Sequence, residues 1–247
     1  MKVALVTDLH ANRDAVEAVM AHAASQGAQR YVFLGDFVGY GAEPGWVVDF
    51  VSDHVRHGAV AVMGNHDSAV VQGPTQTMVP QAREVVAWTR AQLDDDQLDF
   101  LARLPMSVTE GNRLYVHANA FAPTQWAYVV SRLEAIRSLL ATECLFTFCG
   151  HVHEPRLFHL PDSGEAGELS PAPGSPVPLS AGHRWLIIPG ATGQPRDGNP
   201  AACYAIFETE GPAVTFHRVA YDHEAAAAKI RAAGLPERLA DRLVDGE

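Results

Sequence analysis

The chain has 247 residues, of which 47% are hydrophobic and 19% are charged, so it has enough apolar surface for a sizeable core. Its formal net charge of −11 argues against an extended nucleic-acid or anionic-membrane surface, because both require stripes of Lys and Arg. Three scattered cysteines exclude a disulfide framework, and no apolar run resembles a signal peptide or a membrane span. We therefore expect a cytoplasmic protein without a membrane partner. The sequence carries no signal for an oligomeric state.

In the first half of the chain, short apolar runs alternate with helical stretches. Strands are predicted at 3–6, 31–34 and 60–63, and helices at about 12–26, 45–57 and 80–103. This order of strands and helices implies parallel pairing with right-handed crossovers. Within the last helical stretch, the run from Asp94 to Asp96 is expected to be a solvated turn that caps a short helix, not a metal site.

The second half is richer in strands. They are predicted at about 107–109, 114–116, 145–148, 157–160, 185–188, 204–208 and 214–219, with helices at about 125–140 and from Glu224 onward. Residues 161–182 are rich in Pro, Gly and Ser and are predicted to be a surface excursion. Chemistry-bearing residues fall on both sides of it, so we expect one domain spanning 1–247, with two packed sheets and helices outside.

Polar side chains follow five of the predicted strands. They are Asp8 and His10, Asp36, the run Asn65-His66-Asp67, His117, and the pair His151 and His153. The carboxyl ends of strands in an open α/β sheet line a single crevice, so these side chains are expected to meet there. A lone strand-end Asp is usually a turn residue, and a lone His is usually structural. If these residues were only turn residues and structural histidines, their positions after five separate strands would be five independent coincidences.

Imidazole and carboxylate donors suit divalent Zn, Mn, Fe or Ni, and no thiolate is offered. A carboxylate such as Asp36 can bridge two ions, and the amide oxygen of Asn65 can bind one without adding charge. The candidate ligands are sufficient for two ions that share Asp36: Asp8, His10, Asp36, Asn65, His117, His151 and His153. The remaining histidines are interpreted as structural: His22, His54, His57, His159, His183, His217 and His223.

These motifs resemble, in order, those of the calcineurin-like metallophosphoesterase superfamily. The matching segments are Asp8-Leu9-His10, Gly35-Asp36, Gly64-Asn65-His66-Asp67, His117 and Gly150-His151-Val152-His153. Residues 33–41 (FLGDFVGYG) and 189–196 (PGATGQPR) are similar to segments of its small prokaryotic phosphodiesterase-like members. The resemblance covers most of the chain apart from the Pro/Gly/Ser-rich excursion.

The resemblance implies an α/β fold, a four-layer α/β/β/α sandwich of two mixed sheets, with a dinuclear metal site. One ion would be held by Asp8, His10, Asp36 and His153, and the other by Asp36, Asn65, His117 and His151. Family membership also implies that His66 is a catalytic residue that binds no metal, oriented by Asp67.

Such a site predicts a metal-dependent phosphodiesterase acting on a small phosphoester or nucleotide. Two ions can activate a shared water as hydroxide, and His66 can protonate the departing oxygen as a general acid. Asn12 and Arg196 are candidates for contacting the phosphate, although Arg196 also fits a surface turn, and Tyr40 is expected to pack locally. The alternatives are a dinucleoside polyphosphate hydrolase, a phosphoprotein phosphatase, a non-catalytic scaffold of the same fold, and a metal-storage or sensing protein.

Overall fold

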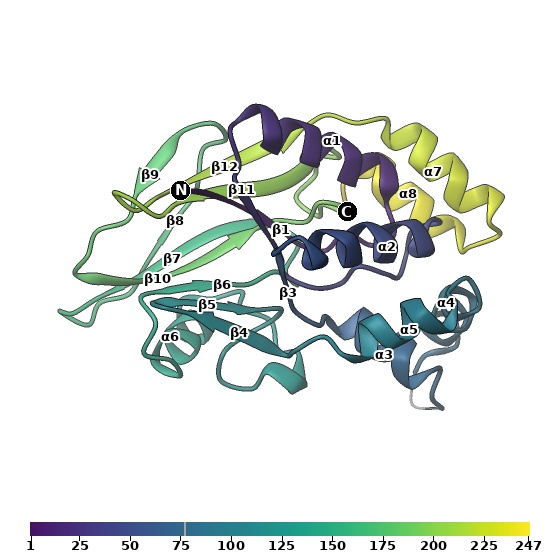
Figure 1. The fold of residues 1–247 in the computed structure, drawn as a ribbon, viewed down its shortest axis with the longest axis horizontal. Coiled ribbons are helices and arrows are strands. Elements are labelled where there is room, and N and C mark those ends of the chain that lie inside the picture. Colours follow the sequence, from purple (N-terminus) through teal and green to yellow (C-terminus); the bar gives the residue numbers. More distant parts are fainter. Residues whose placement is uncertain (77) are drawn as a thin grey trace.

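The computed structural model describes residues 1–76 and 78–247, which form two mixed six-stranded sheets flanked by helices (Figure 1). The first sheet has the order β3-β2-β1-β11-β12-β9, and its strands are Val60–Ala61, Arg30–Phe33, Lys2–Val6, Ala202–Glu208, Ala213–Val219 and Pro176–Pro178. The second has the order β4-β5-β6-β10-β7-β8, and its strands are Ser107–Glu110, Arg113–Val116, Phe146–Phe148, His183–Pro189, Pro155–Pro161 and Gly167–Leu169.

The described helices lie outside the sheets. They are α1 Arg13–Ser25, α2 Pro44–Arg56, α3 Asn65–Gln72, α4 Pro80–Ala91, α5 Asp95–Ala102, α6 Arg132–Leu140, α7 His223–Ala232 and α8 Glu237–Asp245, with a 3₁₀ turn at Pro123–Gln125. None of the helices in the described ranges is both long enough and apolar enough to cross a membrane.

Strand β1 is apolar throughout because both of its faces are covered. Val3 and Leu5 pack toward the second sheet, whereas Ala4 and Val6 belong to the core that includes residues of α1 and α2. β1 runs parallel to β2, and β2 runs parallel to β3, so all three strands end at the same edge of the sheet. This edge is where the sequence places its polar motifs.

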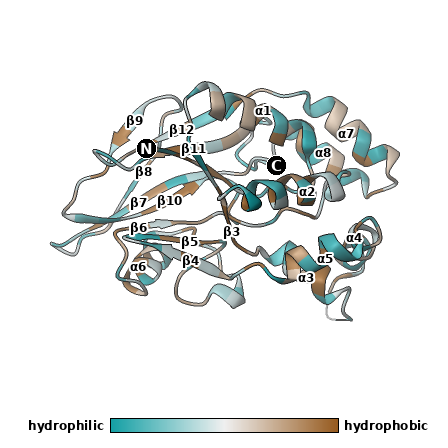
Figure 2. Cartoon of the chain, viewed as in Figure 1, coloured by the Kyte–Doolittle hydropathy of each residue, from teal (hydrophilic) through white to brown (hydrophobic). Residues whose placement is uncertain are grey.

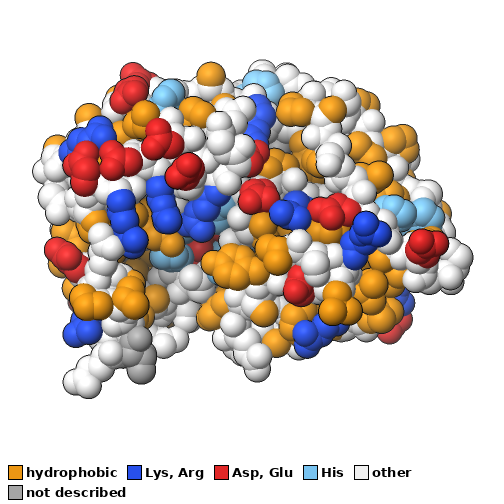
Figure 3. All heavy atoms as spheres, turned by 180° about the vertical axis from the view of Figure 1, so that it is seen from behind, with side chains coloured by type: hydrophobic (Ala, Val, Ile, Leu, Met, Phe, Trp, Pro, Cys, Tyr) orange, Lys and Arg blue, Asp and Glu red, His pale blue; other side chains and the backbone are white. Residues whose placement is uncertain are grey.

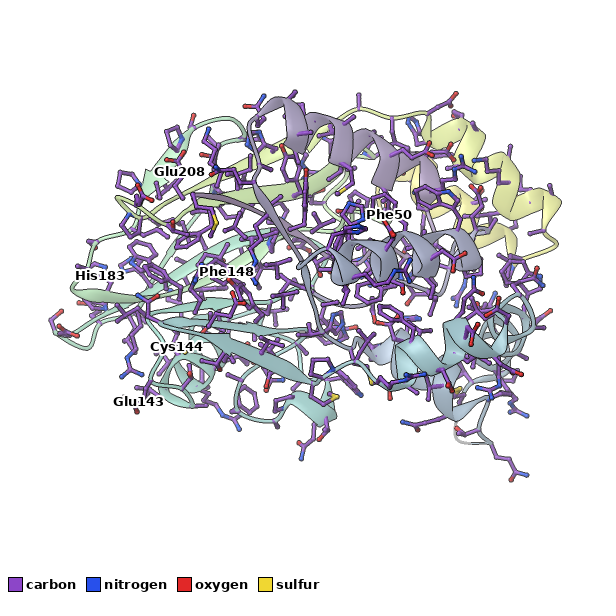
Figure 4. All side chains as sticks on the ribbon, in the orientation of Figure 1. Phe50, Glu143, Cys144, Phe148, His183 and Glu208 are labelled. Atoms are coloured by element: carbon purple, nitrogen blue, oxygen red, sulfur yellow. The ribbon has the colours of Figure 1, made fainter. Side chains whose placement is uncertain are left out.

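The two sheets pack face to face around large side chains. Figure 4 shows Phe148 between the sheets, and its ring lies 5.1 Å from that of Phe207 in the first sheet. The outer face of the second sheet packs against α6 through residues such as Leu139 and Leu186. The layers are therefore helix, sheet, sheet and helix, and the predicted four-layer sandwich is confirmed. Figure 2 shows hydrophobic strands in its interior and hydrophilic residues on the outer helices.

The last two helices form a separate small core beside the sandwich. Leu239 and Leu243 of α8 pack with Ile230 of α7 and with Val85 of α4. The Lys229 ammonium donates hydrogen bonds to carboxylates of α1 and of the residue before α2, which anchors α7 to the main body. Helix α8 lies beside Tyr40 and Asn65, which follow β2 and β3.

Three predicted elements differ in extent from the structure. The helix expected at 125–140 begins only at Arg132, because Trp126 adopts a left-handed conformation (φ 54°) that breaks the helical path. The stretch at 80–103 is two helices, and Asp94 caps the second by accepting a hydrogen bond from the Gln97 amide, as predicted. The strand expected at 60–63 is ordered as β3 only over Val60–Ala61.

Residues 161–182 connect β7 to β10 and are mostly exposed. The segment is predicted as a surface excursion, and it contributes an edge strand to each sheet, β8 pairing with β7 and β9 pairing with β12. Pro176 and Pro178 are compatible with β9 because this strand lies at the edge of its sheet, where a missing amide donor costs little.

Candidate metal centre

The loops after β1 and β2 hold their polar side chains by main-chain hydrogen bonds to each other. The Asp8 amide donates to the Gly35 carbonyl (3.0 Å) and the His10 amide donates to the Asp36 carbonyl (2.9 Å). The His151 amide donates to the Asp8 carboxylate at 3.0 Å, which ties the second sheet to the same point. Strand ends from both sheets are therefore fixed in one place.

Five of the predicted ligands have left-handed backbone conformations. Their φ angles are 54° for Asp8, 46° for His10, 55° for Asp36, 68° for His151 and 67° for His153. Such conformations cost on the order of 1–3 kcal/mol each for residues other than glycine, and they persist where function requires a particular side-chain direction. Their concentration at these strand ends marks the site independently of residue type.

The first group of side chains is fully buried and could hold one ion. Ligand atoms of Asp8, His10, Asp36 and His153 all lie within 4.8 Å of one another. Nε2 of His10 is 3.1 Å from Nε2 of His153, and the latter is 3.3 Å from Oδ1 of Asp8. This is the set that the resemblance implied for one ion.

The second group shares Asp36 with the first. Ligand atoms of Asp36, His117 and His151 lie within 4.8 Å of one another. Nε2 of His117 is 3.2 Å from Nδ1 of His151 and 3.1 Å from Oδ1 of Asn65. The structure thus brings all seven predicted ligands together in two adjoining groups.

Each of the four histidines uses its outer ring nitrogen to donate a hydrogen bond to a main-chain carbonyl. The pairs are His10 Nδ1 with Val38 (3.2 Å), His117 Nδ1 with Leu34 (2.7 Å), His153 Nδ1 with Gln194 (2.6 Å) and His151 Nε2 with Trp126 (2.9 Å). A proton on the outer nitrogen leaves a lone pair on the inner one, which is the usual arrangement for a histidine that binds metal.

These inner lone pairs point at each other and at two buried carboxylates, an arrangement that a cation stabilises. Burial disfavours a charged His117, but the Asp36 carboxylate outweighs this and raises the pKa of His117 to about 9. Positive charge is therefore attracted to this point, either as a proton or as a divalent ion that displaces it. The donor set, with imidazole and carboxylate and no thiolate, fits divalent transition metals.

His66 lies beside both groups but belongs to neither. Its ring makes edge contacts with Tyr40 (4.4 Å between centroids) and with His10 (5.0 Å). In the described part of the chain, no hydrogen bond engages either ring nitrogen, and burial lowers the pKa of His66. Gly39 allows this approach, because a Cβ there would lie 2.5 Å from Nδ1 of His66.

Asp67 does not orient His66, contrary to expectation. Its carboxylate accepts hydrogen bonds from four main-chain amides, those of Gly64 (2.9 Å), Asp36 (2.9 Å), Phe37 (2.9 Å) and Val38 (3.3 Å). Burial and the nearby Asp36 raise the pKa of Asp67 to about 7, although the hydrogen bonds from the Gly64 and Phe37 amides oppose this rise. Asp67 therefore acts on the shape of the loop that carries Asp36, a role that sequence spacing does not reveal.

The predicted phosphate contacts have different environments. The side-chain amide of Asn12 caps α1 by accepting from the Ala15 amide and donates to the Gly193 carbonyl and the Tyr221 hydroxyl, so both of its N–H donors have partners within the protein. The helix cap and the neighbouring loop therefore compete with a phosphate for the Asn12 amide, and its contact with the substrate stays a prediction.

Arg196 lies at the rim of the site. Its side chain donates to Gln194 Oε1 at 2.9 Å, its guanidinium lies 5.6 Å from the centre of the Tyr40 ring, and its amide donates to the His153 carbonyl at 3.3 Å. It is only partly buried and pairs with no carboxylate in the described ranges. The guanidinium therefore remains available to an anion.

Two contacts escaped sequence analysis. Tyr128 stacks on His151 with ring centroids 4.0 Å apart, and main-chain carbonyls such as that of Trp126 hold the histidine rings. A carbonyl has no residue-type signature. The carbonyl that binds His151 belongs to Trp126, which the sequence predicts to lie inside a helix at 125–140.

Comparison with known proteins agrees with this geometry. A family model described as the calcineurin-like phosphoesterase superfamily domain matches residues 1–211. The chain belongs to this superfamily. An uncharacterized protein of Methanocaldococcus jannaschii is 31% identical over 249 residues, covering 99% of this chain and 98% of that protein.

Solved structures extend the comparison. A metallophosphoesterase from Sphaerobacter thermophilus is 38% identical, with a TM-score of 0.87 and complete coverage of both chains. A hypothetical protein from Pyrococcus horikoshii OT3 has a TM-score of 0.79 at 16% identity, covering 100% of this chain and 98% of that one, which shows the shared fold. The protein is accordingly a metallophosphoesterase, a hydrolase of phosphoric esters with clustered His and Asp side chains that are able to hold metal ions.

Proposed function

We propose that this metallophosphoesterase is a phosphodiesterase that acts on a small phosphoester or nucleotide. The observation that carries the proposal is the ring of His66, which forms no hydrogen bond in the described residues and lies beside two groups of candidate ligands that share Asp36. One ion would be held by Asp8, His10, Asp36 and His153, and the other by Asp36, Asn65, His117 and His151. Mn, Fe, Zn and Ni all suit these donors.

Two bound ions would supply hydroxide near neutral pH and neutralise the charge that develops on the phosphoryl oxygens. The residues of the chain would do the remaining work. His66 donates a proton to the departing oxygen, since its ring nitrogens are not committed to a protein partner in the described ranges. Arg196 grips a phosphate oxygen from the rim. Asp67 fixes the conformation of the loop that carries Asp36, because its carboxylate accepts hydrogen bonds from four main-chain amides.

A storage or scaffold protein would not need a partly buried histidine beside its ligands, so the enzyme interpretation is preferred. A small substrate is preferred to a phosphoprotein because His66 lines a cavity of about 310 Å³, within the range of small-molecule sites. We also infer a cytoplasmic location, because the three cysteines are free and buried.

Bis(p-nitrophenyl) phosphate hydrolysis tests the proposal directly. The protein is stripped with a chelator, dialysed, and reloaded separately with Mn²⁺, Fe²⁺, Zn²⁺ or Ni²⁺. We expect no turnover after stripping and recovery with at least one ion, accompanied by binding of about two ions per chain. Loading with two ions and no hydrolysis of diesters or monoesters would contradict the proposal. Hydrolysis of monoesters alone would restrict it to a phosphomonoesterase.

A further inference from the structure

A cavity of about 310 Å³ adjoins the metal centre on the side of His66. Its lining includes Tyr40, Asn65 and His66 together with buried apolar residues such as Val85 and Leu239. Since His66 is the proposed acid for the departing oxygen, the cavity lies where the leaving group must be. Helix α8, from the C-terminal pair of helices, contributes part of the lining of this cavity.

Two arginines of α8 line the outer part of this cavity. Arg238 and Arg242 are four residues apart on one helix, so they lie on the same face. Within residues 1–76 and 78–247, neither guanidinium forms an ion pair or a hydrogen bond. Burial and the nearby charges of Arg196 and Arg238 lower the pKa of Arg242, which shows that the three cations are close enough to repel one another.

This concentration of unpaired positive charge contrasts with the rest of the molecule. The net charge is −11, and ten cationic side chains other than histidine pair with carboxylates in the described part of the chain. On the face in Figure 3, acidic and basic side chains lie next to one another. Like charges four residues apart on a helix destabilise it unless an anion lies between them.

We propose that this cavity binds a leaving group that combines an apolar or aromatic moiety with a phosphate, the phosphate being held by Arg238 and Arg242. The apolar lining residues accommodate the organic part, and Tyr40 supplies an aromatic ring beside His66. The proposal rests on the proposed phosphodiesterase function and names its substrate class: phosphoric esters and anhydrides whose departing part carries a further phosphate, as in dinucleoside polyphosphates, where water attacks phosphorus and the P–O bond to a nucleoside phosphate breaks.

The first test measures binding alone, so it does not depend on turnover. Isothermal titration calorimetry of the chelator-treated protein uses three probes: adenosine 5′-diphosphate, inorganic pyrophosphate and adenosine. We expect the diphosphate to bind tightest, with affinity that weakens at high salt. Replacing both arginines (R238Q with R242Q) should weaken it by roughly tenfold for each lost charged contact. The control R132Q removes an exposed arginine at the start of α6, remote from the cavity, and should leave binding unchanged.

The second test compares turnover of two substrates by the metal-loaded enzyme. Diadenosine tetraphosphate has a phosphorylated leaving group, and bis(p-nitrophenyl) phosphate does not. We expect the double variant to lower the ratio of kcat/KM for diadenosine tetraphosphate to kcat/KM for bis(p-nitrophenyl) phosphate by about tenfold or more. The R238K and R242K variants should be intermediate, because they keep the charge but lose the bidentate contact. Circular dichroism and melting temperature check the fold of each variant.

The outcomes separate the two proposals. If the ratio and the binding constants are the same in wild type and double variant, or if adenosine and pyrophosphate bind as well as the diphosphate, the pocket assignment is wrong. If no phosphoester is hydrolysed but the diphosphate still binds through the arginines, the phosphodiesterase proposal fails while the pocket stands.

Discussion

Two clusters of histidines lie at opposite ends of β10. At one end, His159 and His183 stack with ring centroids 5.1 Å apart, next to Trp185. Figure 4 shows His183 at this end, far from the polar loops. At the other end, the Gln194 carbonyl that follows β10 holds His153 in the metal centre. Both clusters bring imidazole rings together, but their chemistry differs.

The difference lies in the partners of the ring nitrogens. Nδ1 of His159 and Nδ1 of His183 are buried without a hydrogen-bond partner in the described residues, and no carboxylate completes the group. In the metal centre every outer nitrogen has a carbonyl partner and two carboxylates complete the set. Proximity of histidines is therefore insufficient for a metal site. Fixed tautomers and a shared carboxylate are what distinguish one.

The largest expected effect comes from removing the shared carboxylate. Asp36→Asn should lower phosphodiester turnover by about 10⁴-fold or more, because one side chain serves both metal-binding groups. Plasma emission spectrometry of the dialysed protein should show reduced metal content. The control Asp95→Asn changes an exposed carboxylate of α5 and should retain both metal and activity. Full metal content in Asp36→Asn would contradict the shared role of Asp36.

The next largest effect separates the acid from the ligands. His66→Asn should keep the metal content of wild type and lose about 10²–10⁴-fold in turnover of substrates with poor leaving groups, because the proton donor is gone. The loss should be smaller for nitrophenyl esters, whose leaving group needs no proton. An equal loss for both kinds of substrate, or loss of metal, would remove His66 from the acid role.

A third histidine environment predicts pH-dependent stability. Burial, with His22 and Lys2 nearby, lowers the pKa of His217 from 6.5 to about 4, so the folded protein keeps the ring neutral. The unfolded chain takes up a proton below pH 6.5, and stability is therefore lost as the pH falls from about 6.5 toward 4. Urea unfolding at pH 7 and pH 5 should show a smaller loss in His217→Gln than in wild type. The exposed-site control His57→Gln should lose as much as wild type.

The smallest effect is expected at the cluster without carboxylates. His159→Gln combined with His183→Gln should leave metal content and turnover as in wild type, and should change the free energy of unfolding by about 1 kcal/mol or less. Metal analysis and urea unfolding of the double variant provide the check. Loss of an ion would show that ring stacking alone can mark a metal site in this chain.

The sequence by itself determined the layers of the sandwich and the position of the seven clustered side chains. Buried strands read as continuous apolar runs, and polar residues that follow several such runs must meet where the strands end. Asn65 and Asp36 could be placed in this way because their positions follow from strand order. The same local rules correctly placed Asp94 as a helix cap.

Only the tertiary structure decided how these side chains and their neighbours are used. The Asn12 side chain caps a helix and donates a hydrogen bond to a loop carbonyl, and the Asp67 carboxylate accepts hydrogen bonds from four amides. These interactions form because main-chain groups distant in sequence lie next to both side chains. Arg238 and Arg242 were invisible as site residues, since they lie more than 170 positions after His66 and reach its cavity only because α8 folds against α4. Residue types and their spacing predict the chemistry that a segment can perform. The partners of each polar group depend instead on which segments the hydrophobic core brings together.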